Sequence, residues 1–225
     1  MKGRGVFVII PAYNEAVKLG GVLDKVAAYK GQGIISSVVV VDDGSRDNTA
    51  AIALKHGAVL LRHVVNLGKG AALKTGCDFA TSRGADTLVV MDGDGQHDSA
   101  DIPLILKRLR GADMVFTYRK MNHEMPSLFR LGNRFIQFFT GLLYGIKIKD
   151  TLSGFRAFKA GVYKKIRWSS SDYSVESEMI ANAGKHRLRY KQVPIETVYH
   201  DRYKGTTVID GFRIVARMIW WRLTR

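Results

Sequence analysis

The sequence contains very little cysteine and no long apolar run, and each shortage excludes a class of protein. Cys77 is the only cysteine among 225 residues, which excludes an intramolecular disulfide and indicates a reducing compartment. No apolar run approaches the roughly 18 residues that a membrane-spanning helix requires. We expect no signal peptide either, because a short basic stretch leads from Met1 directly into a predicted strand. These shortages predict a cytoplasmic protein.

Two common phosphate-binding fingerprints are also missing. No Gly-x-Gly-x-x-Gly follows the first predicted strand, and Gly68-Lys69-Gly70 lacks the spacing of a P-loop. The acidic stretch 92–96 is not an EF-hand, because His97 stands where that calcium loop requires glycine. A bound diphosphate would therefore have to be held by a metal ion on carboxylates.

The net charge of +15 is concentrated in the second half of the chain. Residues 1–110 carry 14 Lys and Arg against 11 Asp and Glu, whereas residues 111–225 carry 21 against 9. A basic field of this kind attracts nucleic acid, anionic lipid headgroups or phosphorylated substrates. Charge alone does not choose among these partners.

Apolar runs rich in β-branched residues alternate with helical stretches through the first half. We expect strands at 6–10, 38–41, 58–62, 87–91 and 114–118, and helices at 16–29, 49–56, 71–82 and 101–109. Strict alternation predicts a parallel sheet with helices on both faces, and 46% hydrophobic residues suffice for its core. The loops that leave such strands share one edge, where ligands bind.

The loop after the fourth predicted strand carries the densest acidic pattern. Asp92 and Asp94 are spaced i, i+2, and Gln96 adds an amide oxygen. Hard oxygen ligands suit Mg²⁺ or Mn²⁺, which usually leave other coordination positions for substrate phosphates. Taken alone, an ordinary acidic turn explains the pattern equally well.

Four strand-exit stretches occur together, at 10–15 (IPAYNE), 41–47 (VDDGSRD), 66–70 (NLGKG) and 91–97 (MDGDGQH). They resemble the motifs of family 2 glycosyltransferases, in particular the branch of dolichol-phosphate mannosyltransferases and polyprenyl-phosphate glucosyltransferases. The stretch 150–157 (DTLSGFRA) resembles a further motif of that branch, so the resemblance covers about residues 6–205. It implies an α/β fold of the GT-A, Rossmann-like type, with a mostly parallel central sheet.

The resemblance also implies roles for individual residues. Those that would bind the nucleotide sugar are Pro11, Tyr13, Asn14, Glu15, Val41, Asp42, Lys69, Asp92, Gly93 and Arg202. Those that would hold the metal are Asp92, Asp94 and Gln96, with Asp94 central to catalysis. Those that would hold the acceptor phosphate and act in catalysis are Arg119, Arg130 and Arg134. Glu176 and Glu178 are secondary candidates, since acidic residues also favour the first turn of any helix.

We expect a glycosyltransferase domain at 1–205, with a nucleotide-binding half at 1–118 and an acceptor-binding half at 119–205. An amphipathic basic tail follows at 206–225. Its apolar residues at helical spacing are Phe212, Val215, Ala216, Ile219 and Leu223, flanked by Arg213 and Arg217. A helix rich in tryptophan and arginine suits a membrane surface, although packing of this stripe on the domain is an equal alternative. The same two options apply to the expected helix at 128–144.

The predicted reaction is metal-dependent, inverting transfer of a hexose to polyprenyl (dolichyl) phosphate. Mannose from GDP-mannose is favoured over glucose from UDP-glucose because the resemblance points to the dolichol branch. The second pKa of a phosphate monoester is about 6, so this acceptor is already ionised and needs arginines rather than a general base. Attachment would be peripheral, at the cytoplasmic face of a membrane, through the tail or a membrane partner protein.

Two other functions are compatible with parts of the sequence. A transferase of the same fold that acts on a glycan hydroxyl would require a carboxylate base, such as Glu176 or Glu178. A nucleic-acid-binding protein would explain the charge and would bind DNA in a strongly salt-dependent way. It would leave the four strand-exit motifs unexplained, so we expect no nucleic-acid partner.

Overall fold

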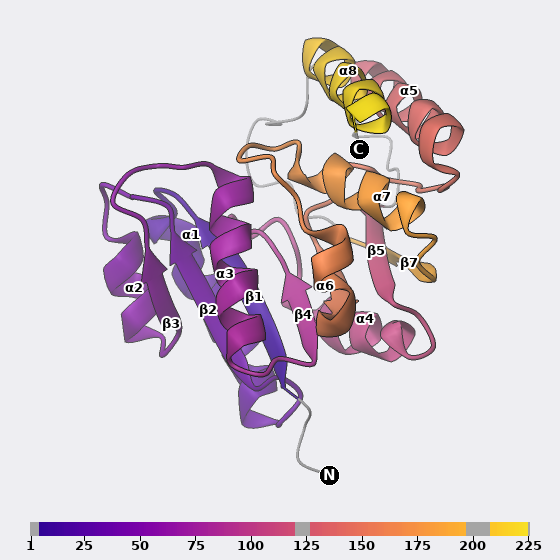
Figure 1. The fold of residues 1–225 in the computed structure, drawn as a ribbon. Helices are drawn as coiled ribbons and strands as arrows, with labels where there is room; N and C mark the ends of the chain where they lie inside the picture. The colour runs from indigo at the N-terminus through magenta and orange to yellow at the C-terminus, as the bar shows by residue number, and fades with distance from the viewer. Residues whose placement is uncertain (1–4, 120–126, 197–207, 225) are drawn as a thin grey trace.

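A seven-stranded sheet runs through the part of the chain that the computed structural model describes, residues 5–119, 127–196 and 208–224 (Figure 1). The strands are β1 (Val6–Ala12), β2 (Ser37–Asp42), β3 (Val59–Arg62), β4 (Thr87–Val90), β5 (Met114–Arg119), β6 (Arg156–Lys159) and β7 (Tyr190–Ile195). They are arranged in the order β3-β2-β1-β4-β6-β5-β7. The expected α/β fold with a mostly parallel sheet is confirmed.

One strand of this sheet runs against the others. Four neighbouring pairs are parallel, whereas β6 is antiparallel to both β4 and β5. Arg156, at the start of β6, pairs with Val90 of β4 and Phe116 of β5. The four residues of β6 form no apolar run long enough to identify a strand from the sequence. Since β6 opposes both neighbours, β4 and β5 point the same way and end at the same edge.

Helices cover both faces of the sheet. They are α1 (Ala16–Gly31), α2 (Thr49–Lys55), α3 (Lys69–Ser82), α4 (Ile102–Leu109), α5 (Ser127–Tyr144), α6 (Ala160–Ile166), α7 (Val175–Lys185) and α8 (Val208–Thr224), with a 3-10 turn at Ser99–Asp101. Side chains of α1 and α4 share one core cluster with the sheet, and those of α3, α6 and α7 share another. Val8 of β1 lies in the first cluster and Ile9 in the second. Burial on both faces explains why the central strands are continuously apolar.

The last helix lies beside α5, above α7 (Figure 1). Ile214, Val215 and Met218 of α8 are buried against Ile136 of α5, and the Tyr144 hydroxyl donates a hydrogen bond to the Met218 carbonyl oxygen at 2.6 Å. Packing of the tail on the domain is therefore observed. No helix within the described ranges is both long and apolar enough to cross a membrane.

The stripe that packs is not the one expected from the sequence. Of the predicted residues only Val215 is buried, whereas Phe212, Ile219 and Leu223 remain 59%, 39% and 79% exposed. The helix has two apolar stripes, and α5 covers only one of them. Residues 197–207, which join β7 to α8 in the sequence, lie outside the described residues.

Truncating a phenylalanine of β6 tests whether this strand holds the sheet together. Phe158 is fully buried, so we expect Phe158→Ala to lower the free energy of unfolding by about 3–5 kcal/mol in urea denaturation. The matched control is Phe138→Ala in α5, whose side chain is 66% exposed and should cost less than about 0.5 kcal/mol. Equal losses for the two variants would contradict the central position of β6.

Candidate active site

The strand-exit loops meet at one edge of the sheet, because β1 to β4 are mutually parallel neighbours. The loops are 13–15 after β1, 42–43 after β2, 66–69 after β3 and 92–96 after β4. Arg119 ends β5 at the same edge, two strands away from β4. Neighbouring strands lie about 4.8 Å apart, which puts Arg119 roughly 10 Å from the acidic loop along the edge.

Hydrogen bonds join the first two loops into one wall. The Asn14 amide donates to the Ser45 hydroxyl oxygen at 2.9 Å, and the Asn14 side-chain oxygen accepts from the Arg46 amide at 2.9 Å. The Glu15 amide donates to Thr49 Oγ1 at 2.9 Å. Asn14 has a φ of 55°, a left-handed conformation that asparagine tolerates better than most residues. The conformation of these two loops therefore depends on contacts between residues more than 30 positions apart.

The predicted nucleotide-sugar residues differ in their access to this edge. Tyr13 and Asn14 are exposed, Pro11, Glu15, Lys69 and Asp92 are partly buried, and Val41, Asp42 and Gly93 are buried. Arg202 lies outside the described residues. The Val41 side chain packs in the core, and the Asp42 carboxylate accepts from the Ser45 amide and pairs with Arg62 at 3.0 Å. Asp42 therefore stabilises its own loop.

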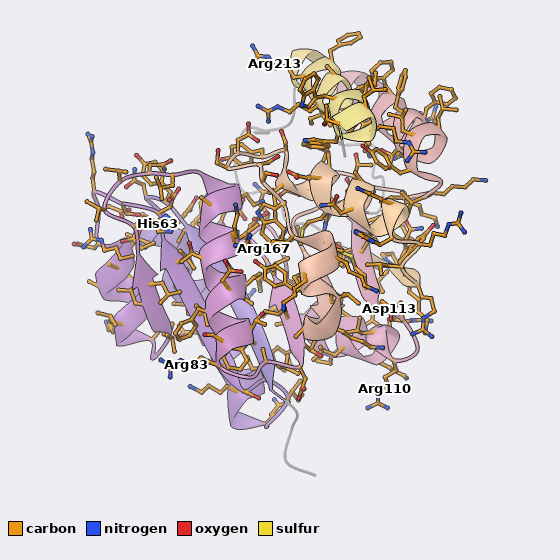
Figure 2. All side chains as sticks on the ribbon, viewed as in Figure 1. His63, Arg83, Arg110, Asp113, Arg167 and Arg213 are labelled. Carbon is orange, nitrogen blue, oxygen red and sulfur yellow. The ribbon has the colours of Figure 1, made fainter. Side chains whose placement is uncertain are left out.

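Asp43 and His63, neither of which is among the predicted site residues, organise the loop in front of α3. Asp43 accepts hydrogen bonds from the Leu67 and Gly68 amides at 2.9 and 2.8 Å. Its Oδ1 lies 2.6 Å from His63 Nδ1, and His63 Nε2 lies 2.9 Å from Thr75 Oγ1. His63 is labelled among the loops at this edge in Figure 2. The contacts span 12 to 25 residues, so no local spacing could have revealed them.

Lys69, the first residue of α3, lies between two carboxylates. Its Nζ is 2.6 Å from Asp92 Oδ1 and 2.7 Å from Glu176 Oε1 of α7. The other Asp92 oxygen is 3.5 Å from His97 Nε2. The ammonium joins the loop after β4 to the first turn of α7, and thus the predicted nucleotide-binding half to the acceptor-binding half.

Ionisation follows from this arrangement. Burial alone would raise the pKa of Asp92, but Lys69 and His97 hold that pKa well below its usual range. Burial alone would lower the pKa of Lys69, but Asp92 and Glu176 raise it above its usual value. Lys69 and Asp92 are therefore both charged at neutral pH, and a substrate that reaches Asp92 meets an ion pair rather than a free carboxylate.

Asp94 and Gln96 are the predicted metal ligands that remain accessible. Both are partly buried, and Asp94 Oδ1 accepts a hydrogen bond from the Gln96 amide at 3.0 Å. Among the described residues no cluster of three or more His, Cys, Asp or Glu could hold a metal. One carboxylate and one amide oxygen fit Mg²⁺ or Mn²⁺ only if substrate phosphates supply further ligands, which is how these ions usually bind. One of the two Asp92 oxygens, Oδ1, is already paired with Lys69.

The stretch before β6 brings the DxxSGFR residues to the same edge. A Cβ on Gly154 would lie 2.5 Å from Asp92 Oδ2, so the bare glycine backbone is needed for Asp92 to fit. The Thr117 hydroxyl donates to the Phe155 carbonyl oxygen at 2.6 Å. Asp150 pairs with Arg119 through contacts of 2.7 and 3.2 Å. The antiparallel strand thus places Asp150 where it fixes the Arg119 guanidinium.

The remaining predicted residues fall in three different environments. Glu178 is buried and accepts four hydrogen bonds from the amides and hydroxyls of Ser169 and Ser170, which occupy it structurally. Arg134 is exposed on α5, four residues before exposed Phe138. Arg130 belongs to α5, but its side chain lies outside the described residues. Of the two glutamates, only Glu176 faces Lys69 and Asp92.

The arrangement of this sheet and of the acidic loop at its edge is that of the GT-A fold. Glucosyl-3-phosphoglycerate synthase from Mycobacterium tuberculosis, solved with Mn²⁺, UDP-glucose and phosphoglyceric acid, has the same fold. Its TM-score is 0.76 over 96% of this chain and 80% of that chain, at 20% identity.

The chain belongs to glycosyl transferase family 2, whose model matches residues 7–167. UDP-N-acetylglucosamine–dolichyl-phosphate N-acetylglucosaminyltransferase from Methanococcus voltae is 30% identical over 99% of this chain and 98% of its own length. Undecaprenyl-phosphate mannosyltransferase from Micrococcus luteus is 30% identical over 92% of this chain and 88% of its own. The predicted family is confirmed.

Replacing Lys69 tests the ion-pair cluster. We expect Lys69→Met to lower the free energy of unfolding at pH 7 by about 3–5 kcal/mol, because two carboxylates lose their shared cation. The depressed pKa of Asp92 stabilises wild type above the unfolded-state pKa of about 3.9, and this contribution is lost as the pH falls below that value. The difference between variant and wild type should therefore shrink below about pH 4.

Urea denaturation at several pH values measures this effect. The control is Lys55→Met, an exposed lysine at the end of α2, which should change stability by less than about 0.5 kcal/mol at every pH. A Lys69→Met penalty that stays constant from acid to neutral pH would show that Lys69 contributes packing rather than charge.

Proposed function

We propose that the protein transfers a hexose from a nucleotide sugar to a polyprenyl phosphate. The observation that carries this proposal is the shared sheet edge, where Lys69, Asp92 and Arg119 gather around the acidic loop. Two relatives that align over most of the chain are named for transfer to dolichyl phosphate and to undecaprenyl phosphate. They differ in the sugar, N-acetylglucosamine or mannose, so GDP-mannose and UDP-sugars are all candidate donors.

The donor would bind across the joined loops after β1 and β2, with its diphosphate toward Asp94. A divalent cation held by Asp94 and Gln96, with Asp92 beside it, would neutralise the charge that develops on the leaving diphosphate. We name Mg²⁺ or Mn²⁺ for this role, and the related synthase was solved with Mn²⁺. Lys69 supplies a second positive charge at the same place, fixed by its two carboxylate partners.

The acceptor requires orientation rather than deprotonation. A phosphate monoester is largely a dianion at neutral pH, because its second pKa is about 6. Arginine binds such a group through two parallel hydrogen bonds. We propose Arg119 and Arg130 for this role, with Asp150 as the residue that positions Arg119. Direct attack on the anomeric carbon would invert its configuration.

We further propose that α5 and α8 place the enzyme on the membrane that holds its lipid acceptor. Their exposed apolar side chains are Phe138, Leu142, Phe212, Ile219, Trp220 and Leu223, which we call the outer apolar face. Arg134 on α5 and Arg213 on α8 are exposed as well, and Figure 2 shows Arg213 at the outside of the molecule. Tryptophan beside arginine suits the headgroup region of an anionic bilayer. Attachment would be peripheral, at the cytoplasmic face.

A panel of donors tests the reaction. Purified protein is incubated with polyprenyl phosphate, Mn²⁺ or Mg²⁺, and labelled GDP-mannose, UDP-glucose or UDP-N-acetylglucosamine, and the label is then extracted into organic solvent. We expect lipid-linked label from one donor and none in chelator. Arg130→Ala should lower the rate by about a hundredfold through the lost charge stabilisation, whereas Glu176→Gln should keep substantial activity because no base is needed. The reverse ranking would favour a hydroxyl acceptor.

Vesicle sedimentation tests the membrane surface. We expect Leu223→Ser to weaken binding to phosphatidylglycerol vesicles by about tenfold, since a buried leucine contributes about 1.5–3 kcal/mol. Leu54→Ser is the matched control, an exposed leucine in α2 beyond the other end of the sheet, and should bind as wild type does. Equal binding by both variants would show that this end of α8 does not contact the vesicle surface.

A further inference from the structure

Arg217 connects α8 to the segment that precedes α7. Arg217 Nη1 donates to both carboxylate oxygens of Asp172, at 2.9 and 2.7 Å, and to the Ser174 hydroxyl oxygen at 2.5 Å. Ser174 is the N-cap of α7, and its amide donates to Asp172 Oδ1 at 2.9 Å. Glu176, the partner of Lys69, lies only two residues further on.

The loop that contains Asp172, residues 168–173, is also held against the start of α3. The Gly70 amide donates to the Ser171 carbonyl oxygen at 2.7 Å, and Trp168 Nε1 donates to the Gly70 carbonyl oxygen at 2.7 Å. A Cβ on Gly70 would overlap the Ser170 carbonyl, so the two backbones touch. This loop therefore contacts the turn that carries Lys69. Two chains of contacts connect Arg217 with Lys69: one runs through the 168–173 loop, and the other runs through the first turn of α7, which carries Glu176.

The Arg217–Asp172 pair lies next to the outer apolar face, because Arg217 is three residues before exposed Trp220 on α8. Both side chains are 48% exposed, and ion pairs with this access to water contribute little to stability. Arg217 belongs to the same helix as exposed Trp220, so seating α8 on lipid would displace water beside the pair. An ion pair strengthens as the surrounding dielectric constant falls. A contact that is weak in water would then hold the 168–173 loop firmly.

We propose that Arg217 couples membrane seating of α8 to the order of the Lys69–Glu176 site, so that the enzyme becomes fully active only at a lipid surface. This inference rests on the proposed function and adds its regulation. The lipid surface strengthens the Arg217–Asp172 contact, which fixes the start of α7 and the turn before α3. Lys69 and Glu176 are then held at the donor site where the acceptor is present.

The test compares two variants that break the pair from opposite sides. Arg217→Gln removes the guanidinium, and Asp172→Asn removes the carboxylate charge but keeps an oxygen for the Ser174 amide and the full charge of α8. Arg222→Gln is the control, because it removes one exposed positive charge of α8 outside the Asp172 contact. Transfer to a short, water-soluble polyprenyl phosphate is measured with and without vesicles of equal parts phosphatidylcholine and phosphatidylglycerol. Amide hydrogen exchange across 168–178 is measured on the same samples.

We expect vesicles to raise the rate of wild type and Arg222→Gln and to slow their amide exchange across 168–178. Arg217→Gln and Asp172→Asn should keep the rate seen without vesicles and bind vesicles as Arg222→Gln does. They should lose about fivefold or more of the stimulation, the lower range of coupling between linked sites, together with the added protection.

Two outcomes would overturn the coupling. Stimulation and protection like wild type in both pair variants would show that the contact transmits nothing. Equal loss with and without vesicles would show that the pair only supports the fold. Failure of the proposed reaction is a separate result, because wild type would then form no lipid product while exchange and vesicle binding still report on the coupling.

Discussion

The position of the Lys69 ammonium between Asp92 and Glu176 depends on most of the fold. A lysine at the first position of a helix is unfavourable for the helix dipole, and its burial adds a desolvation cost. Two carboxylates within 2.7 Å compensate for both. They come from the loop after β4 and from α7, which are far apart in sequence, so the ion pairs form only when both elements are in place. The cluster therefore joins the loop after β4 to the first turn of α7.

The antiparallel strand β6 explains how the second half reaches this cluster. Because it enters the sheet between β4 and β5, the residues before it arrive at the edge that already carries Asp92. Gly154 then packs on Asp92, and Asp150 holds Arg119. A strictly parallel arrangement would have delivered the start of such a strand to the opposite edge. The direction of one four-residue strand thus determines whether Gly154 and Asp150 reach the edge that carries Asp92 and Arg119.

Helix α8 has two apolar stripes, one buried against α5 and one exposed. Met218 and its neighbours bury one stripe of α8 against α5, which satisfies the need for a packed core. Trp220 and Leu223 leave a second stripe in contact with water, which costs solubility unless another surface covers it. The proposed membrane contact would cover this second stripe. Arg217 of the same helix pairs with Asp172, two residues before the N-cap of α7, so the element proposed to contact lipid also contacts the start of α7.

The sequence by itself determined the family and, in the first half of the chain, the order of strands and helices. Continuous apolar runs such as that around Val8 can only be buried strands, and carboxylates directly after them must lie at a sheet edge. Only the tertiary structure decided that β6 is inserted between β4 and β5 and that Lys69 pairs with Asp92. It further decided that Glu178 binds the Ser169 and Ser170 amides, whereas Glu176 faces the site. It also decided which stripe of α8 is covered. Those outcomes depend on contacts between residues tens of positions apart, where local periodicity carries no information and the competition between packing partners sets the result.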